Sequence, residues 1–302
     1  MLQPPGFRQD SISTSLGSIV YYTADQATSP ASQSTRKRSP EDQPPIVFLH
    51  GFGGGSSAYE WSKVYPAFVP EYQVIAPDLL GWGRSNHLTR PYQIEDYLIT
   101  IREFLEQVAP SPAIVVASSL TAAFVVRVAV SYPGLIRSLI LSAPTGLADF
   151  GQPYQNPIAS IVSIPGVDRL LYSTVIANPF GIRTFLEQRQ FAQSNRVSPE
   201  VVDAYLASAL QPNAEASALS LVRGDLCFDL AQYLPDLTVP TAILWGRQAQ
   251  LSPPALAQRF AELNPRAIKA VEVLEGVGLT PQLELPAVTI GVIRQFLAEL
   301  SS

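Results

Sequence analysis

The hydrophobic positions along the chain follow two alternating patterns from residue 46 to residue 143. Short apolar runs, typical of buried parallel strands, are separated by longer segments whose apolar residues recur at helical spacing. The predicted strands cover 46–50, 72–78, 113–117 and 139–143, and an amphipathic helix is predicted over 93–108. Because strands that alternate with helices form parallel βαβ units, the pattern predicts an α/β fold in which a mostly parallel central sheet is flanked by helices.

The pattern changes on both sides of this region. Residues 1–24 alternate polar and apolar positions, which predicts an N-terminal β-hairpin of the core, and residues 25–45 are rich in Ser, Pro, Gln and charge, which predicts a flexible linker. Between 145 and 237, helical segments separated by prolines follow one another without strands, which predicts an inserted helical cap. The core therefore consists of two parts in this interpretation, residues 46–144 and residues 238–302.

The composition narrows the possible functions. Of the 302 residues, 47% are hydrophobic and only 15% are charged, which favours an apolar small-molecule ligand, a peripheral membrane contact or a protein partner. The net charge of −5 gives no basic surface for nucleic acid, so we expect no nucleic-acid partner. The N-terminal residues lack the features of a secretory signal, and the lone Cys227 cannot form an internal disulfide. We therefore expect a soluble, cytoplasmic protein.

Ser119 lies at the junction between the predicted strand 113–117 and the helix that follows it. Ligands of open α/β sheets bind at the carboxyl ends of the strands, which makes this serine the first candidate for chemistry. The local sequence VASSLTA resembles the nucleophile elbow G-x-S-x-G of the α/β-hydrolase superfamily, with Ala117 and Thr121 in place of the two glycines. We expect the β-branched side chain of Thr121 to open this turn slightly.

Other segments extend the resemblance over nearly the whole chain. They are HGFGGG at 50–55, PDLLGWGRS at 77–85, ILWG at 243–246 and GVGLTPQLELP at 276–286. Their order resembles the capped members of the superfamily, and the SSLTA elbow is also similar to a cyanobacterial and plastid group of hydrolase-like proteins. The resemblance implies that Ser119 occupies the nucleophile position and that the backbone N–H groups of Phe52 and Leu120 form an oxyanion hole.

The same resemblance identifies two missing catalytic groups. The family pattern W-G-x-x-D places the catalytic acid at Ala249, and the pattern G-x-G-H places the catalytic base at Leu279. A serine hydroxyl without a base is a poor nucleophile. The leading hypothesis is therefore a pseudoenzyme that binds an apolar small molecule or a partner. The alternative is a slow or atypical esterase or lipase-like hydrolase, or other acyl or enolate chemistry, that uses Ser119 and the oxyanion amides.

Few residues could replace the missing groups. The chain has two histidines: His50, in the glycine-rich turn, and His87, which we expect to face solvent. His50, Gly51 and Asp149 are candidates for ligand binding, and Asp149 follows the predicted strand 139–143. We expect no metal site and no cofactor.

Overall fold

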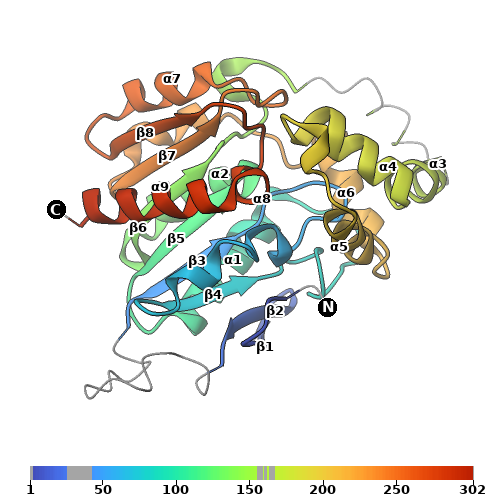
Figure 1. Ribbon diagram of the computed structural model, residues 1–302, viewed down its shortest axis with the longest axis horizontal. Coiled ribbons are helices and arrows are strands. Elements are labelled where there is room, and N and C mark those ends of the chain that lie inside the picture. Colours follow the sequence, from blue (N-terminus) through green and yellow to red (C-terminus); the bar gives the residue numbers. More distant parts are fainter. Residues whose placement is uncertain (1–2, 26–42, 155–158, 160–161, 163–166, 302) are drawn as a thin grey trace.

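The computed structural model describes residues 3–25, 43–154, 159, 162 and 167–301 (Figure 1). Most of the predicted linker therefore lies outside the described residues. In the described part, eight strands form one sheet in the order β1-β2-β4-β3-β5-β6-β7-β8. The strands are β1 (Phe7–Thr14), β2 (Gly17–Ala24), β3 (Pro45–Leu49), β4 (Gln73–Pro77), β5 (Ala113–Ser118), β6 (Ile136–Ser142), β7 (Thr241–Gly246) and β8 (Ile268–Leu274). Strands β3 to β8 pair in parallel, which confirms the predicted α/β fold.

The predicted hairpin forms one edge of this sheet. Strands β1 and β2 pair antiparallel from Phe7 opposite Ala24 to Thr14 opposite Gly17, and β2 then pairs antiparallel with β4. The alternation of polar and apolar residues in the sequence reflects this position, because an edge hairpin has one face packed on the core and one in solvent.

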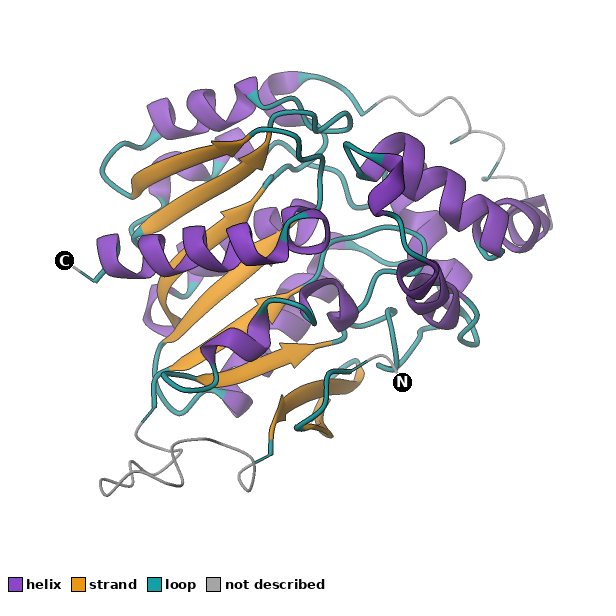
Figure 2. Ribbon diagram, in the orientation of Figure 1, coloured by secondary structure: helices purple, strands orange, loops and turns teal. Residues whose placement is uncertain are grey.

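Helices cover both faces of the parallel strands (Figure 2). Helices α1 (Ile94–Val108), α2 (Ser119–Ser131) and α7 (Ala255–Leu263) pack on one face, and α9 (Pro286–Glu299) packs on the other with the 3-10 turns η3 (Ala58–Trp61) and η4 (Tyr65–Phe68). Successive residues of β3 and β5 contribute to opposite cores: Val47 and Val115 to the first, Phe48 and Val116 to the second. Burial on both faces is why these strands appear in the sequence as continuous apolar runs.

Residues 145–237, which connect β6 to β7, are called the helical insertion below. Their described helices are α3 (Val167–Leu171), α4 (Pro179–Phe185), α5 (Pro199–Ala209) and α6 (Ala214–Arg223), joined by 3-10 and π turns. Two of the prolines that interrupt the sequence are helix starts, because Pro179 and Pro199 follow capping residues, and the cap Asn178 accepts a hydrogen bond from a backbone N–H of its helix. In Figure 1 the insertion lies beyond the carboxyl ends of the strands. The division into domains stays a prediction.

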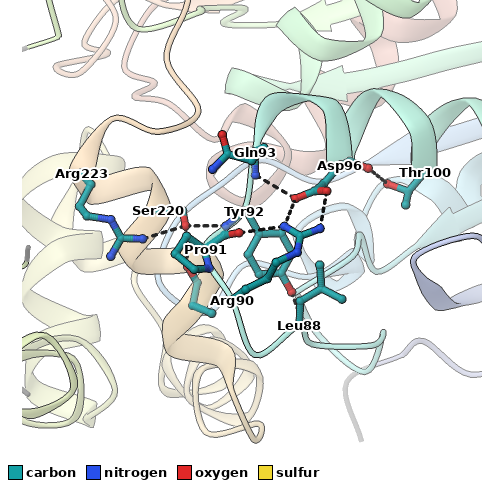
Figure 3. Close-up of polar contacts among 10 residues, drawn as sticks. Leu88, Arg90, Pro91, Tyr92, Gln93, Asp96, Thr100, Ser220 and Arg223 are labelled. Atoms are coloured by element: carbon teal, nitrogen blue, oxygen red, sulfur yellow. Dashed lines mark hydrogen bonds and ion pairs between the residues drawn. The ribbon is translucent and has the colours of Figure 1, made fainter. Parts of the chain in front are cut away.

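The helical insertion is hydrogen-bonded to the start of α1 (Figure 3). The Ser220 hydroxyl of α6 accepts hydrogen bonds from the Tyr92 backbone N–H (2.9 Å) and from the Arg223 guanidinium (3.1 Å). Beside it, the guanidinium of Arg90 donates two hydrogen bonds to the Asp96 carboxylate, at 2.7 and 2.8 Å. Burial alone would raise the pKa of Asp96, but the hydrogen bonds from Arg90 and from the Gln93 backbone N–H, together with the charge of Arg90, outweigh burial, and the pKa is lowered. None of the described helices is long and apolar enough to cross a membrane.

Candidate functional site

Ser119 begins α2 directly after β5, in a backbone conformation that L-residues rarely adopt. Its φ angle is 55°, in the left-handed region, whereas the preceding Ser118 is extended. A residue held there carries roughly 1–3 kcal/mol of strain, which the surrounding packing must offset. The turn leaves Ser119 half-buried on the wall of a cavity. The strand, sharp turn and helix that the sequence predicts around Ser119 are all present.

Thr121 is accommodated in this turn by a specific contact. Its side chain is fully buried, and its hydroxyl donates a 2.7 Å hydrogen bond to the backbone carbonyl of His50. Ala117, which replaces the other glycine of the elbow pattern, is also fully buried. The β-branched residue therefore links the elbow helix to the glycine-rich turn that follows β3.

The glycine-rich turn packs directly against the elbow. A Cβ atom at Gly51 would lie only 3.1 Å from Ser118 Oγ and 3.3 Å from Ser119 Cβ, so a larger residue would require these two neighbours to shift by a few tenths of an ångström. Phe52 and Leu120 both line the cavity together with Ser119. The two residues whose amides are implied as an oxyanion hole are thus brought to the same wall, and the use of their N–H groups stays a prediction.

A carboxyl group that the sequence analysis did not single out lies beside this turn. Glu60 of η3 is only 2% exposed and lines the cavity. One of its oxygens accepts a hydrogen bond from the Gly51 backbone N–H (2.9 Å), and the other accepts one from the Tyr205 hydroxyl (3.0 Å), which itself accepts one from the Gln190 amide (2.8 Å). Burial raises the pKa of Glu60 despite these hydrogen bonds. In the sequence, Glu60 is distinguished only by being a charged residue next to apolar residues shortly after the glycines.

The cavity has a volume of about 1120 Å³. The elbow, the glycine-rich turn, the helical insertion and the loops after β7 and β8 all contribute to its wall. Several lining side chains are apolar and also reach solvent, among them Phe180 (80% exposed), Val175 (53%) and Leu251 (47%). The cavity therefore opens to the surface through an apolar mouth. In the described residues, no group of three or more His, Cys, Asp or Glu side chains could hold a metal ion.

Known proteins with this architecture identify the family. The family described as alpha/beta hydrolase fold matches residues 44–284. The chain belongs to the α/β-hydrolase-fold family. It is similar to Lipase 1 of Psychrobacter immobilis, with 26% identity over 248 residues that make up 80% of this chain and 72% of the lipase. It is also similar to a probable esterase of Oryza sativa subsp. japonica, with 24% identity over 82% of this chain and 89% of the esterase. Among solved structures, Cfl2 of Burkholderia cenocepacia superposes with a TM-score of 0.77 at 20% identity, over 97% of this chain and 98% of Cfl2.

In this α/β-hydrolase-fold protein, both histidines lie away from the cavity wall. His50 was predicted to bind ligand with Gly51 and Asp149, but it is fully buried and is not among the lining residues. Its Nδ1 lies 2.7 Å from the Gly51 carbonyl, and its Nε2 accepts a hydrogen bond from the Leu79 backbone N–H at 3.0 Å. Burial lowers its pKa to about 4. The neutral ring therefore uses both nitrogens to hold the backbone.

His87 is half-buried, so the expectation that it faces solvent is wrong. Its Nε2 lies 3.2 Å from the Gly83 carbonyl, and burial lowers its pKa. It does not line the cavity either. Because the chain has only these two histidines, no imidazole lines the cavity beside Ser119.

The two positions that the resemblance assigns to the acid and the base lie on neighbouring loops. Ala249 follows β7, is 7% exposed and packs into the core. Leu279 follows β8, lines the cavity, and is held by a hydrogen bond from its backbone N–H to the Gln190 carbonyl (2.8 Å). An aliphatic side chain therefore forms the cavity wall at the position that the family pattern gives to the base.

Asp149 lines the cavity, but its carboxylate is occupied by local contacts. It accepts hydrogen bonds from the Thr145 hydroxyl (2.6 Å) and from the backbone N–H groups of Gly146 (3.1 Å) and Leu230 (2.9 Å). Burial raises its pKa. These contacts fix the turn after β6 onto the end of the helical insertion, and ligand binding by Asp149 stays a prediction.

Proposed function

We propose that this α/β hydrolase binds an apolar small molecule in its cavity and lacks the histidine-dependent ester hydrolysis for which the fold is equipped. The observation that carries the proposal is the position of the two histidines. His50 has both ring nitrogens bound to the backbone beneath the turn, and His87 is outside the cavity. Ser119 therefore has no neighbouring group that could accept its proton at neutral pH as an imidazole does.

The energetic consequence of this arrangement is large. In serine hydrolases, loss of the nucleophile or base removes about 10⁶ of the rate, and binding with the oxyanion hole leaves roughly 10³–10⁴ over water. The two carboxyl groups on the wall are held by hydrogen bonds from neighbouring groups. Asp149 is saturated with hydrogen bonds, and both oxygens of Glu60 already accept one. A residual, slow reaction is the most that Ser119 would support.

The cavity supports the binding half of the proposal. Its volume of about 1120 Å³ exceeds the usual range of small-molecule sites, roughly 300–1,000 Å³. Leu279 in place of a histidine makes its wall more apolar, and the exposed side chains of Phe180 and Val175 at the mouth offer an apolar route inward. These side chains also leave open the membrane or protein partner that the composition favours, which stays a prediction.

A second candidate function is slow or atypical ester hydrolysis. It is favoured by the similarity to proteins named Lipase 1 and probable esterase, and by the strained elbow that holds Ser119 at the cavity wall. Phe52 and Leu120 at the same wall would stabilise an oxyanion in this case.

Two measurements on the purified chain separate these functions. A fluorophosphonate probe reports an activated serine, and 1-aminoanthracene, an uncharged fluorophore, reports an apolar cavity. We expect no stoichiometric labelling of Ser119, and saturable binding of about one 1-aminoanthracene per chain. The Ser119→Ala variant is the matched control for labelling. Stoichiometric labelling that this variant abolishes would overturn the proposal, and so would the absence of saturable fluorophore binding.

A further inference from the structure

The charged side chains that line the cavity are separated by sign. Among the described lining residues, Glu60 and Asp149 are only 2% and 7% exposed, whereas Arg189 and Arg259 are exposed to solvent. The carboxyl groups therefore belong to the buried wall, and the guanidinium groups belong to the mouth. In a chain with a net charge of −5, the entrance of the cavity carries positive charge.

The two arginines come to the mouth from different parts of the fold. Arg189 lies in the π turn η8 (Leu186–Gln190) of the helical insertion, and Arg259 lies in α7 of the core. The guanidinium of Arg189 has no ion pair or hydrogen bond with any described residue. Arg259 stacks on the ring of Phe150 at 3.6 Å and has no carboxylate partner in the described part of the chain. Both groups can therefore bind an anion at the mouth.

The neighbouring arginines of the helical insertion are already paired. Arg183 donates a hydrogen bond to the Glu187 carboxylate at 3.1 Å, and Arg196 donates one to the Gly276 carbonyl at 2.6 Å. Arg189 differs from them in lining the cavity and in lacking such a partner. Compensation of a nearby negative charge therefore does not account for Arg189.

The buried carboxyl groups oppose a negative group farther inside the cavity. Neither Glu60 nor Asp149 forms an ion pair with a described arginine, lysine or histidine, and both accept hydrogen bonds from neutral donors. Like charges repel strongly where water is excluded. An anionic group of a ligand is therefore disfavoured at the buried wall and favoured at the mouth.

We propose that the cavity binds a free single-chain amphiphile whose apolar chain lies inside and whose anionic headgroup, a carboxylate or similar oxyanion, stays at the mouth with Arg189 and Arg259. This inference rests on the proposed function and specifies the chemical class of its ligand. Guanidinium groups bind such oxygens through charge-assisted hydrogen bonds. The apolar chain supplies most of the affinity, and the arginines select the headgroup.

The test compares octanoate, 1-octanol and octylammonium, which share one chain length, by displacement of 1-aminoanthracene at pH 7. We expect octanoate to bind about three- to tenfold more tightly than 1-octanol, and octylammonium to bind more weakly than octanoate. The advantage of octanoate over 1-octanol should fall by about twofold or more in Arg189→Gln. It should disappear in the double variant Arg189→Gln with Arg259→Gln, and it should shrink in wild-type protein as salt rises from about 0.01 M to about 0.5 M.

The matched control is Arg137→Gln. Arg137 of β6 is also exposed and has no ion pair with a described residue, but it does not line the cavity, so the preference for octanoate should be unchanged. The affinity for 1-octanol should be the same in every variant, which shows that the cavity itself is intact. Arg189→Gln should also keep its thermal stability, because this guanidinium has no partner in the described fold.

Each other outcome overturns a defined part. Failure of 1-aminoanthracene to bind would overturn the proposed function and with it this inference. Fluorophore binding without a preference for octanoate, or with a preference that persists in the double variant, would overturn only the inference. Octylammonium as the tightest ligand would overturn it as well, since the buried carboxyl groups would then select the headgroup. Co-sedimentation with phosphatidylglycerol vesicles that Arg189→Gln abolishes would overturn the choice of a free amphiphile in favour of a bilayer lipid.

Discussion

The proposed function predicts that an acid at position 249 and a base at position 279 would together activate Ser119. The double substitution Ala249→Asp with Leu279→His introduces a carboxylate and an imidazole on the joined loops after β7 and β8. Ser119 keeps its strained backbone, and Phe52 and Leu120 already lie on the same wall. If the inactive state arises from positions 249 and 279, the variant should gain esterase activity without any change at the elbow.

The structure sets the expected magnitudes for stability. Ala249 is 7% exposed, so Asp at this position alone buries a carboxylate without a partner, and we expect the free energy of unfolding to fall by about 3–5 kcal/mol. Histidine at position 279 would supply a hydrogen-bond donor to that carboxylate. The double variant should then be more stable than the sum of the two single substitutions by about 1–2 kcal/mol.

The activity gain is limited by geometry. A complete triad contributes about 10⁶ to kcat, and a misplacement of about 1 Å costs roughly 10². The backbone of Leu279 is held by Gln190, which fixes where the new ring begins but not its rotamer. We therefore expect kcat/KM for a p-nitrophenyl ester to rise by about 10² or more over the wild-type protein, which corresponds to about 2.7 kcal/mol of transition-state stabilisation.

The assay is ester turnover together with fluorophosphonate labelling, each with Ser119→Ala added to the double variant as control. Each single substitution should remain close to the wild-type rate, because neither supplies a complete acid-base pair. A folded double variant that stays unreactive would refute the reasoning, since the elbow itself would then be incompetent. Wild-type protein that already turns over as fast would refute it equally.

Three further predictions concern the contacts that hold the site. Thr121→Val should lower the free energy of unfolding by about 1–2 kcal/mol in denaturant titrations, because it leaves the buried His50 carbonyl without its donor, whereas Thr121→Ser should largely preserve stability. The pKa of His50 lies at about 4 in the folded chain, below its ordinary 6.5, so the unfolded chain binds more protons between these values and stability should fall by up to about 3 kcal/mol as pH drops through this window. A gap between wild-type and His50→Gln stabilities that does not narrow over that window would contradict this. Asp96→Asn should cost about 1–2 kcal/mol at pH 7, a modest value because the Arg90 partner is half-exposed. Since the folded pKa of Asp96 is lowered, the loss should shrink as pH falls below about 4. The loss should be smaller in an Arg90→Gln background, where the carboxylate keeps only its hydrogen bond from the Gln93 backbone N–H.

The parts of the fold that the sequence predicts well are those in which burial determines the residue pattern. The prediction of a strand over 113–117 agrees with β5 (Ala113–Ser118) to within one residue, because all six residues of β5 are buried. The apolar run predicts a strand from residue 139, but β6 begins at Ile136, which already pairs with Ala113 of β5, because exposed Arg137 interrupts the run. A single exposed side chain near the start of a strand breaks the apolar run, so the predicted strand begins too late.

The candidate site was predictable only where a motif fixed the backbone. The positions of Ser119, Phe52 and Leu120 followed from turns whose order the sequence displays. Glu60 could not be predicted, since its role depends on Tyr205, which is distant along the chain and meets it only through the fold of the helical insertion. The half-burial of His87 likewise arises from tertiary packing that no local pattern reports.

The elbow around Ser119 gives weaker support for hydrolysis than its resemblance to a nucleophile elbow suggests. The fold itself requires most of the elbow's features. The positive φ at Ser119 lets the chain pass from β5 into α2, and Thr121 and Gly51 bind this turn to the neighbouring loop. A chain without catalytic activity would still need these residues, because replacing them would disrupt the packing of the turn. Positions 249 and 279 are different, since the sheet places no packing demand on them for an acid or an imidazole. What stands at these two positions, Ala249 and Leu279, is therefore the part of the site that discriminates between binding and hydrolysis.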